Sequence, residues 1–405
     1  MVMKPGGSEA QTPTLAVALA HDYATQRGGA ERVALWLAQA FPDAPMYTTL
    51  YDPEGTFPEF AALDLRTTPL NRIGLLRRYH RLSLPLLAPA LMTQRVESDV
   101  LLASSTGWAH GYRGAGRTVV YCHAPARWLY QRDRYLGPTS PPGANAKVRR
   151  LAAAAALGLL SPPLRRWDRR AAARADVYLA NSTVTQRAIR EVYDIDAEVL
   201  PPPPAMLPDG QEQPVPGLTP GYLLCIARLL PYKNVDLLIR AAAARGAEEV
   251  VVVGDGPDRG RLEALARQTG RARLLGRVHD DELRWLYRNA SMLVAASYED
   301  YGLSPLEAGA FGRPSVVLRD GGYLDTVRDG VTGTFFDAPE VDLVARAIDE
   351  AAGRCWDDDV LKAHVESFSL QRFVARLQDV VSQVQQPGSG RPIHDVAPRG
   401  DDDHP

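Results

Sequence analysis

The sequence predicts an α/β protein built from two parallel sheets in separate domains. The chain has 405 residues, and at roughly 150 residues per domain this length predicts two or three domains. Short apolar runs alternate with helical patterns in both halves, which indicates parallel strands joined by helices. Between the halves, residues 201–220 include eight prolines, a composition typical of a stiff, extended linker.

The apolar runs give the expected strands in chain order. In the front domain, residues 14–200, they are Leu15–Leu19, Val100–Ala103, Thr118–Cys122, Val177–Ala180 and Glu198–Leu200. In the back domain, residues 221–370, they are Tyr222–Ile226, Val250–Val253, Met292–Ala295, Ser315–Leu318 and Gly333–Phe336. An amphipathic pattern over Gln371–Val384 predicts a further helix at 371–385, and the Pro-, Gly- and Asp-rich residues 386–405 are typical of disorder.

Composition excludes several classes of protein. Apolar residues make up 45% and charged residues 23% of the chain, as in an ordinary globular protein and unlike a fibre or a disordered chain. No dense basic run is interleaved with aromatic residues, so we expect no nucleic-acid partner. Three widely spaced cysteines suggest neither a disulfide framework nor a metal site, and with no transmembrane segment expected they favour the cytoplasm.

The sharpest local signal is the segment from Ser297 to Glu307, which follows an expected strand. Ser304 and Glu307 fit the N-cap and third positions of a helix, so Glu307 could serve only as a helix cap. The alternative is a binding site. A helix start beside Gly302 offers free backbone N–H groups to an anion, and Glu299 and Glu307 flank that point as acceptors for the hydroxyls of a sugar or ribose.

Two cations follow the first strand of the back domain. Arg228 and Lys233 lie five residues apart at a strand's carboxyl end, a spacing that suits a diphosphate as well as an ordinary solvated loop. Each charge-assisted hydrogen bond at such a site contributes about 1.5–3 kcal/mol. The nearby glycines Gly254 and Gly256 lack the spacing of the dinucleotide fingerprint, so we assign them no binding role.

Two loops of the front domain also follow strands. Gly28 and Gly29 open a helix and would let the backbone approach a phosphate or a sugar, although an ordinary strand-to-helix turn has the same pattern. His123 and Arg127 follow another strand and are placed to reach the crevice at the carboxyl edge of the sheet, although a lone histidine is more often structural. Farther along, Ser182 is expected to cap the next helix.

Together these motifs resemble the family 4 glycosyltransferases of the GT-B architecture, over roughly Leu15–Val384. The most specific part is the pair Glu299 and Glu307 with Asp-Tyr-Gly-Leu-Ser-Pro-Leu between them. Arg228 and Lys233, within IARLLPYKNVDLLIRA, match the family's phosphate-binding pair. The blocks VVVGDGP and LLGRVHDDELRWLYRNASMLVAAS follow in the family's order. The resemblance implies two Rossmann-like domains facing across a cleft, with a last helix that returns to the first domain.

The resemblance also implies a retaining transfer of a sugar from a nucleotide-sugar donor. Its catalytic residues would be Glu299, His123, Arg228 and Lys233. The donor would further contact Gly28, Gly29, Arg277, Val278, Tyr301, Gly302, Leu303 and Glu307, and Arg127 is the candidate acceptor-binding residue. In this scheme the leaving diphosphate takes the acceptor's proton, so neither a metal nor another cofactor is implied.

The front domain looks closest to bacterial mannosyltransferases that use GDP-mannose in exopolysaccharide or O-antigen synthesis, on the residues Tyr121–Arg127, Trp128–Tyr130 and Arg166–Asp168. The expected acceptor is a saccharide or a lipid-linked saccharide. Arginines between Arg72 and Arg81 are interleaved with leucines, which suits either peripheral contact with an anionic membrane at its inner face or a basic loop over core leucines.

Several alternatives remain open at this stage. The same family includes enzymes that use UDP- or ADP-sugars, with small-molecule acceptors among their substrates. The scaffold also suits a sugar phosphorylase or a nucleotide-sugar epimerase, since fold does not settle function. A non-catalytic protein that binds a nucleotide sugar is the alternative from another class. The sequence carries no signal for the oligomeric state.

Overall fold

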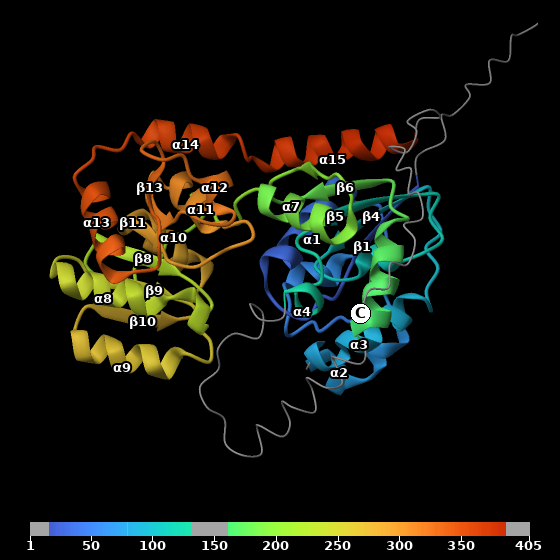
Figure 1. The fold of residues 1–405 in the computed structure, drawn as a ribbon, viewed down its shortest axis with the longest axis horizontal. Coiled ribbons are helices and arrows are strands. Elements are labelled where there is room, and N and C mark those ends of the chain that lie inside the picture. The colour runs from blue at the N-terminus through green and yellow to red at the C-terminus, as the bar shows by residue number, and fades with distance from the viewer. Residues whose placement is uncertain (1–15, 79, 132–160, 386–405) are drawn as a thin grey trace, which may run out of the picture.

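The structure is a computed structural model, and it describes residues 16–78, 80–131 and 161–385. The described residues form two α/β domains side by side (Figure 1), each built around one sheet. The expected tail at 386–405 and Leu15 of the first expected strand lie outside the described residues. No helix within the described ranges has the length and apolar character needed to cross a membrane.

The N-terminal domain contains a seven-stranded sheet in which every pairing between these strands is parallel. The strand order is β3-β2-β1-β4-β5-β6-β7. The strands are β1 (Val17–His21), β2 (Met46–Thr48), β3 (Leu65–Thr67), β4 (Val100–Ser105), β5 (Arg117–Cys122), β6 (Val177–Ala180) and β7 (Glu198–Val199). Strands β4 and β5 are almost wholly buried, as expected for central strands covered on both faces.

The C-terminal domain contains a six-stranded parallel sheet in the order β10-β9-β8-β11-β12-β13. The strands are β8 (Tyr222–Ile226), β9 (Val250–Val253), β10 (Ala272–Gly276), β11 (Ala290–Ala295), β12 (Ser315–Leu318) and β13 (Gly333–Phe336). In each sheet the first three strands are added toward one edge and the later strands toward the other. The strand order therefore has a switch point beside β1 and beside β8, and ligands bind at such points in open α/β folds.

Helices connect the strands in both domains. The helices and 3₁₀ turns of the N-terminal domain are α1 (Gly29–Ala40), η1 (Pro58–Ala62), η2 (Pro69–Arg72), α2 (Gly74–Arg78), α3 (His80–Leu91), η3 (Ala109–Gly111), α4 (Arg127–Tyr130), helical residues 161–172 and α7 (Thr183–Tyr193). Those of the C-terminal domain are η4 (Pro231–Lys233), α8 (Val235–Arg245), α9 (Arg259–Thr269), α10 (Asp280–Asn289), α11 (Ser304–Ala310), α12 (Tyr323–Thr326), α13 (Val341–Ala352) and α14 (Asp358–Glu366).

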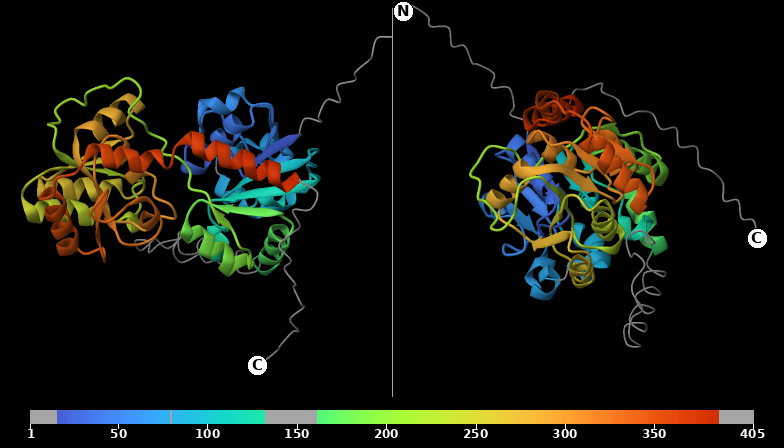
Figure 2. Two further views of the ribbon diagram at one scale, coloured as in Figure 1. Left: turned by 90° about the horizontal axis from the view of Figure 1, so that it is seen from above. Right: turned by 90° about the vertical axis from the view of Figure 1, so that its left-hand side faces the viewer.

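The last helix, α15 (Leu370–Gln385), leaves the C-terminal domain and runs along the N-terminal domain (Figures 1 and 2). Its Phe373 is 2% exposed and meets the rings of Trp36 and Tyr121 edge-on, at centroid distances of 6.4 and 5.6 Å. Leu377 and Val381 are fully buried in the same cluster. The apolar stripe predicted for this helix therefore completes the core of the first domain.

All ten expected strands exist, and each agrees with an observed strand within two residues at each end. The sequence analysis missed β2, β3 and β10. Strands β2 and β3 have only three residues each, and β10 is half-buried and contains Arg273, so none shows a distinct apolar run. The predicted N-cap is confirmed, because the Ser182 hydroxyl accepts the Thr185 N–H at 3.0 Å.

Candidate active site

The carboxyl edges of the two sheets face each other, and the loops that follow the strands meet there. A Cβ atom built on Gly29, after β1, would stand 3.5 Å from the Leu303 side chain, after β11. The Ser182 hydroxyl donates to the Asp300 carbonyl at 2.6 Å. Loops that carry most of the predicted site residues are thus in contact between the domains.

The loop after β8 carries both predicted cations. Lys233 ends η4 and forms an ion pair with Glu299, which also accepts the Ser297 hydroxyl at 2.7 Å. The Arg228 side chain is exposed and makes no ion pair or hydrogen bond with the other described residues. The structure therefore brings Lys233 and Glu299 together and leaves Arg228 available to an anion at the same strand end.

Two glycines that we assigned no role support this loop. A Cβ on Gly254 would stand 2.0 Å from the Ala227 carbonyl oxygen, and one on Gly256 would stand 2.3 Å from that of Leu229. The Leu229 N–H also donates to the Asp255 carbonyl at 3.0 Å. Any larger residue would push the β9–α9 loop away from the segment that holds Arg228. The dinucleotide spacing gives no signal for these glycines, because their role is close packing between two loops.

The segment from Ser297 to Leu303 folds tightly against the loop after β12. Gly302 has φ of +80°, and a Cβ there would stand 2.6 Å from the Tyr323 ring, so only glycine fits this turn. The Gly322 N–H donates to the Glu299 carbonyl at 2.8 Å. These contacts fix the backbone on either side of Glu299.

The predicted cap at Glu307 is wrong. The helix α11 has its N-cap at Leu303, with no side-chain cap bond, and Ser304 lies inside the helix. The Glu307 carboxylate instead accepts the Tyr287 hydroxyl and backbone N–H groups of Ala205 and Met206. Burial raises the pKa of Glu307, and these hydrogen bonds oppose the rise. A long-range contact with the linker thus replaces the expected local one.

Tyr301 also contacts the linker. Its side chain is 6% exposed, and its hydroxyl donates to the Pro202 carbonyl at 2.7 Å. The side chain of this predicted donor-binding residue is therefore held by the linker. The other two donor-binding candidates, Arg277 and Val278, directly follow β10, with Arg277 exposed and Val278 half-buried. They lie at the same edge as Gly254, whose N–H donates to the Gly276 carbonyl at 2.8 Å.

On the N-terminal side, Gly28 is the N-cap of α1 and Gly29 its first residue. Sequence reasoning missed Glu31, which is 2% exposed and whose Oε2 has no hydrogen-bond partner among the described residues. A Cβ on Gly28 would stand 2.6 Å from this oxygen, so the glycine makes room for the carboxyl group. Burial raises the pKa of Glu31 to about 7.

His123 is held in a buried chain of hydrogen bonds. Its Nε2 lies 2.9 Å from the Ser104 hydroxyl, which lies 3.0 Å from Nδ1 of His21. All three side chains are at most 5% exposed. Burial, helped by the neighbouring His21 and Arg127, lowers the pKa of His123 to about 3. At neutral pH His123 is therefore an uncharged hydrogen-bonding group.

Arg127 reaches across to the other domain and forms an ion pair with Asp300. Beside it, Asp325 accepts both the N–H and the hydroxyl of Thr183, each at 2.7 Å. Since Thr183 is the first residue of α7, the Asp325 carboxylate lies at the positive end of that helix. These contacts join the two domains next to Glu299.

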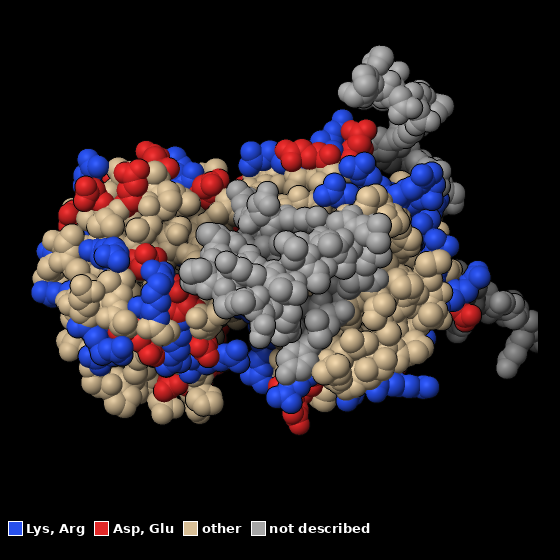
Figure 3. Space-filling view, turned by 60° about the horizontal axis from the view of Figure 1, so that its bottom comes forward, with Lys and Arg blue, Asp and Glu red and all other residues tan. Residues whose placement is uncertain are grey.

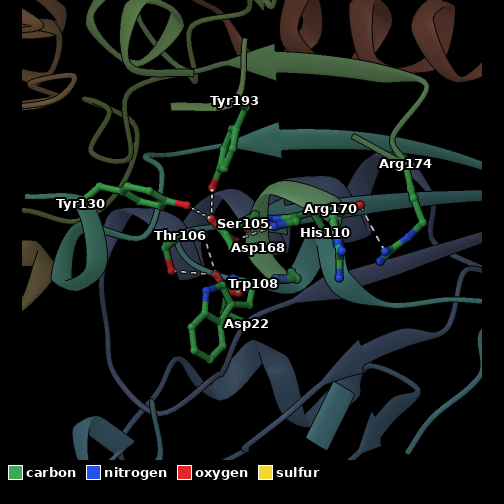
Figure 4. Close-up of polar contacts among 11 residues, drawn as sticks. Asp22, Ser105, Thr106, Trp108, His110, Tyr130, Asp168, Arg170, Arg174 and Tyr193 are labelled. Atoms are coloured by element: carbon green, nitrogen blue, oxygen red, sulfur yellow. Dashed lines mark hydrogen bonds and ion pairs between the residues drawn. The ribbon is translucent and has the colours of Figure 1, made fainter. Parts of the chain in front are cut away.

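A second buried network lies in the same domain (Figure 4). The Asp22 carboxylate accepts the backbone N–H groups of Trp108 and Ala109, each at 2.7 Å. His110 bridges Ser105 and Asp168 at 3.1 and 3.0 Å. The hydroxyls of Tyr130, in α4, and Tyr193, in α7, also donate to Asp168, at 2.8 and 2.9 Å.

The Ser105–His110–Asp168 arrangement superficially resembles a hydrolytic triad. Ser105 is 1% exposed and Asp168 is fully buried, so no substrate reaches the hydroxyl. The network instead joins the loop after β4 to α4, which begins at Arg127, and to α7. Within the described residues, no group of three or more His, Cys, Asp or Glu side chains is arranged to hold a metal ion.

Two family models match the chain, one in each half. Residues 27–203 match Glycosyltransferase Family 4, and residues 211–352 match Glycosyl transferases group 1. Among curated proteins, a D-inositol 3-phosphate glycosyltransferase of Salinispora tropica is 34% identical over 185 residues, covering 40% of this chain and 38% of that protein. An uncharacterized glycosyltransferase of Methanocaldococcus jannaschii is 34% identical over 134 residues, covering 31% and 34%. The chain thus spans well under half the length of these relatives.

Solved structures match nearly the whole chain at low identity. HepE of Anabaena, solved in complex with UDP, has a TM-score of 0.65 at 17% identity. The match covers 91% of this chain and 100% of the HepE chain. A sucrose-phosphate synthase of Thermosynechococcus elongatus has a TM-score of 0.64 at 17% identity, covering 91% and 98%. These likenesses show the fold. That fold is GT-B, and each half of the chain matches a glycosyltransferase family model.

Proposed function

We propose that this protein is a retaining glycosyltransferase that moves a hexose from a nucleotide-sugar donor to a saccharide or lipid-linked saccharide. The observation that carries the proposal is the convergence of Lys233, Glu299 and the exposed Arg228 at one edge, opposite Gly29 and His123. Cations at a strand end suit the donor diphosphate, and a fixed carboxylate beside them suits sugar hydroxyls.

Charge stabilisation is the main catalytic effect in this proposal. As the sugar leaves, negative charge builds on the nucleotide diphosphate, and Lys233 and Arg228 stabilise it. Glu299, released from Lys233 when the diphosphate takes that partner, accepts a sugar hydroxyl. The neutral His123 contacts the transferred sugar, and the diphosphate takes the acceptor's proton. Glu307 would accept the ribose hydroxyls, for which it must exchange its contact with Tyr287.

GDP-mannose is the first candidate donor, on the resemblance of the front domain to mannosyltransferases. A UDP-sugar is the second, since HepE, which shares the fold, was solved with UDP and with UDP-glucose. No described contact selects between the two bases. The choice therefore belongs to experiment.

The test is donor breakdown across GDP-, UDP- and ADP-sugars, with binding measured in parallel. We expect breakdown or tight binding of one donor class, lost in both Lys233→Ala and Glu299→Ala. Lys362→Ala is the matched control, because Lys362 is an exposed lysine on α14 of the same domain. Release of GDP from GDP-mannose supports the first donor, and release of UDP supports the second. Binding of no nucleotide sugar would contradict the proposal and favour a non-catalytic scaffold.

A further inference from the structure

We propose that a polar hollow beside β3 binds the phosphate group of the acceptor. This inference rests on the proposed function and adds the substrate class of the acceptor. The hollow is lined by the end of β3, by η2 and α2, and by the residues that follow α3. It carries two arginines, Arg72 and Arg77, and no acidic residue.

The two arginines have no acidic partner. Neither Arg72 nor Arg77 forms an ion pair or a hydrogen bond within the described part of the chain, although most other described arginines of this domain do. A pair of uncompensated guanidinium groups in one hollow attracts a dianion, and the planar guanidinium matches the oxygens of a phosphate. A phosphate monoester is therefore the ligand that this lining fits.

The walls of the hollow are fixed by hydrogen bonds from three segments. The Asn71 Oδ1 accepts the Tyr51 N–H at 2.9 Å, and the Gln94 amide donates to the Thr67 carbonyl at 2.7 Å. The Thr68 hydroxyl donates to the Thr49 carbonyl at 2.8 Å. The hollow is thus a built feature of the sheet edge rather than a gap between mobile side chains.

Its position favours an acceptor over an unrelated anion. Thr67 is the last residue of β3, so the hollow lies at the same carboxyl edge as the candidate active site. In the sheet, β3 is two strands from β1, about 10 Å at the usual strand spacing. A molecule with a phosphate at one end and a reactive hydroxyl at the other can therefore span from Arg72 to Gly29. The larger hollow, which includes Asp99 and Gly114, lies at the opposite edge, where β1 and β4 begin.

Two exposed apolar residues lie between lining residues of the hollow in the sequence. Ile73 is 49% and Leu75 is 61% exposed, directly between the two arginines in sequence. Figure 3 brings forward the side that carries α2 and α3, and there basic side chains rim a largely uncharged surface. A phosphate on a lipid and a phosphate on a soluble sugar both fit this chemistry. The exposed Ile73 and Leu75 would contact a lipid, so their substitution separates the two sources.

The first arm of the test uses inorganic phosphate and the full chain. Arginine side-chain Nε resonances are followed by NMR during the titration, and those of Arg72 and Arg77 are assigned with single Gln variants. We expect both to shift, and the Arg72→Gln/Arg77→Gln double variant to weaken binding at this site about tenfold or more. The matched control is Arg169→Gln/Arg170→Gln, two exposed arginines outside the hollow. A response at Arg228 with none at Arg72 or Arg77 would overturn the proposal and leave the donor site intact.

The second arm uses phosphatidylcholine vesicles with and without phosphatidic acid. Sedimentation with phosphatidic-acid vesicles that is lost in the double arginine variant and weakened by Ile73→Ser/Leu75→Ser supports a lipid-linked acceptor. A phosphate response without vesicle binding supports a soluble phosphorylated acceptor. Vesicle binding that persists in the double arginine variant contradicts the hollow as the contact. Donor binding should stay within about twofold in every variant, which separates a failure here from a failure of the proposed function.

Discussion

The carboxyl edges of the two sheets face each other with different chemistry. The C-terminal edge presents charged side chains from loops, with Arg228 exposed and Lys233 paired to Glu299. The N-terminal edge presents buried groups in hydrogen-bonded chains, such as His21, Ser104 and His123. The C-terminal edge is suited to binding an anion, and the N-terminal edge to holding neutral groups in one geometry.

This difference predicts that variants at the N-terminal edge change stability, whereas variants at the C-terminal edge change turnover. The largest expected effect is that of Asp168→Ala. It leaves His110 and two tyrosine hydroxyls without their acceptor, so we expect a loss of about 3–5 kcal/mol in the free energy of unfolding. Chemical denaturation measures it, with the exposed Asp196→Ala as control. A loss below about 1 kcal/mol would show that the network does not hold the domain together.

Next in size is Glu31→Gln, whose effect depends on pH. The pKa of Glu31 rises from 4.5 in the unfolded chain to about 7 in the folded protein. Below pH 4.5 both states hold the proton. Between pH 4.5 and 7 only the folded state keeps it, so stability falls as pH rises, by up to about 3 kcal/mol. Thermal unfolding should therefore show Glu31→Gln stabilised at pH 8 and nearly neutral at pH 4.5. Equal effects at both pH values would contradict the burial of this carboxyl.

At the C-terminal edge, Lys233→Ala should lower donor turnover by about 100-fold or more, the effect of removing one donor to a developing anion. Its free energy of unfolding should change by about 1 kcal/mol or less, since the partly exposed Glu299 keeps Ser297 as partner. Turnover kinetics with denaturation curves test both. Unchanged turnover would remove Lys233 from the proposed diphosphate site.

The smallest expected effect lies between the two edges. Asp325→Ala removes two hydrogen bonds to the start of α7, and it should weaken the contact between the domains by about 1 kcal/mol. Small-angle scattering should then show a larger radius of gyration, while Asp329→Ala, on the same domain, should leave it unchanged. An unchanged radius in Asp325→Ala would mean that other contacts hold the domains in this arrangement.

Features that depend on the local sequence were predicted, and features that depend on contacts between distant residues were not. Apolar runs placed ten strands because central parallel strands are buried on both faces. The three-residue strands β2 and β3 were missed because their pairing depends on neighbours distant in sequence. Local spacing likewise suggested a cap for Glu307, whereas its partners Tyr287, Ala205 and Met206 are 20 residues or more away.

The candidate site shows the same division. Lys233 and Glu299, separated by 66 residues, were placed at one site by the resemblance to the family 4 glycosyltransferases, and the structure pairs them. No pattern indicated that Ser104 joins His21 to His123, or that Glu31 is buried with one carboxyl oxygen lacking a hydrogen bond. Hydroxyls and single carboxylates are common at turns, so their roles emerge only when the packing is known.

The path of α15 has a consequence for how the chain is made. On the ribosome, a domain usually folds as soon as it has emerged. Here the apolar surface around Trp36 and Tyr121 is covered by Phe373, Leu377 and Val381, which are synthesised only after the whole second domain. The first domain must therefore wait, with that surface uncovered, until the last helix emerges. Nascent chains stalled before residue 370 should accordingly bind chaperones, and release should follow when α15 leaves the exit tunnel.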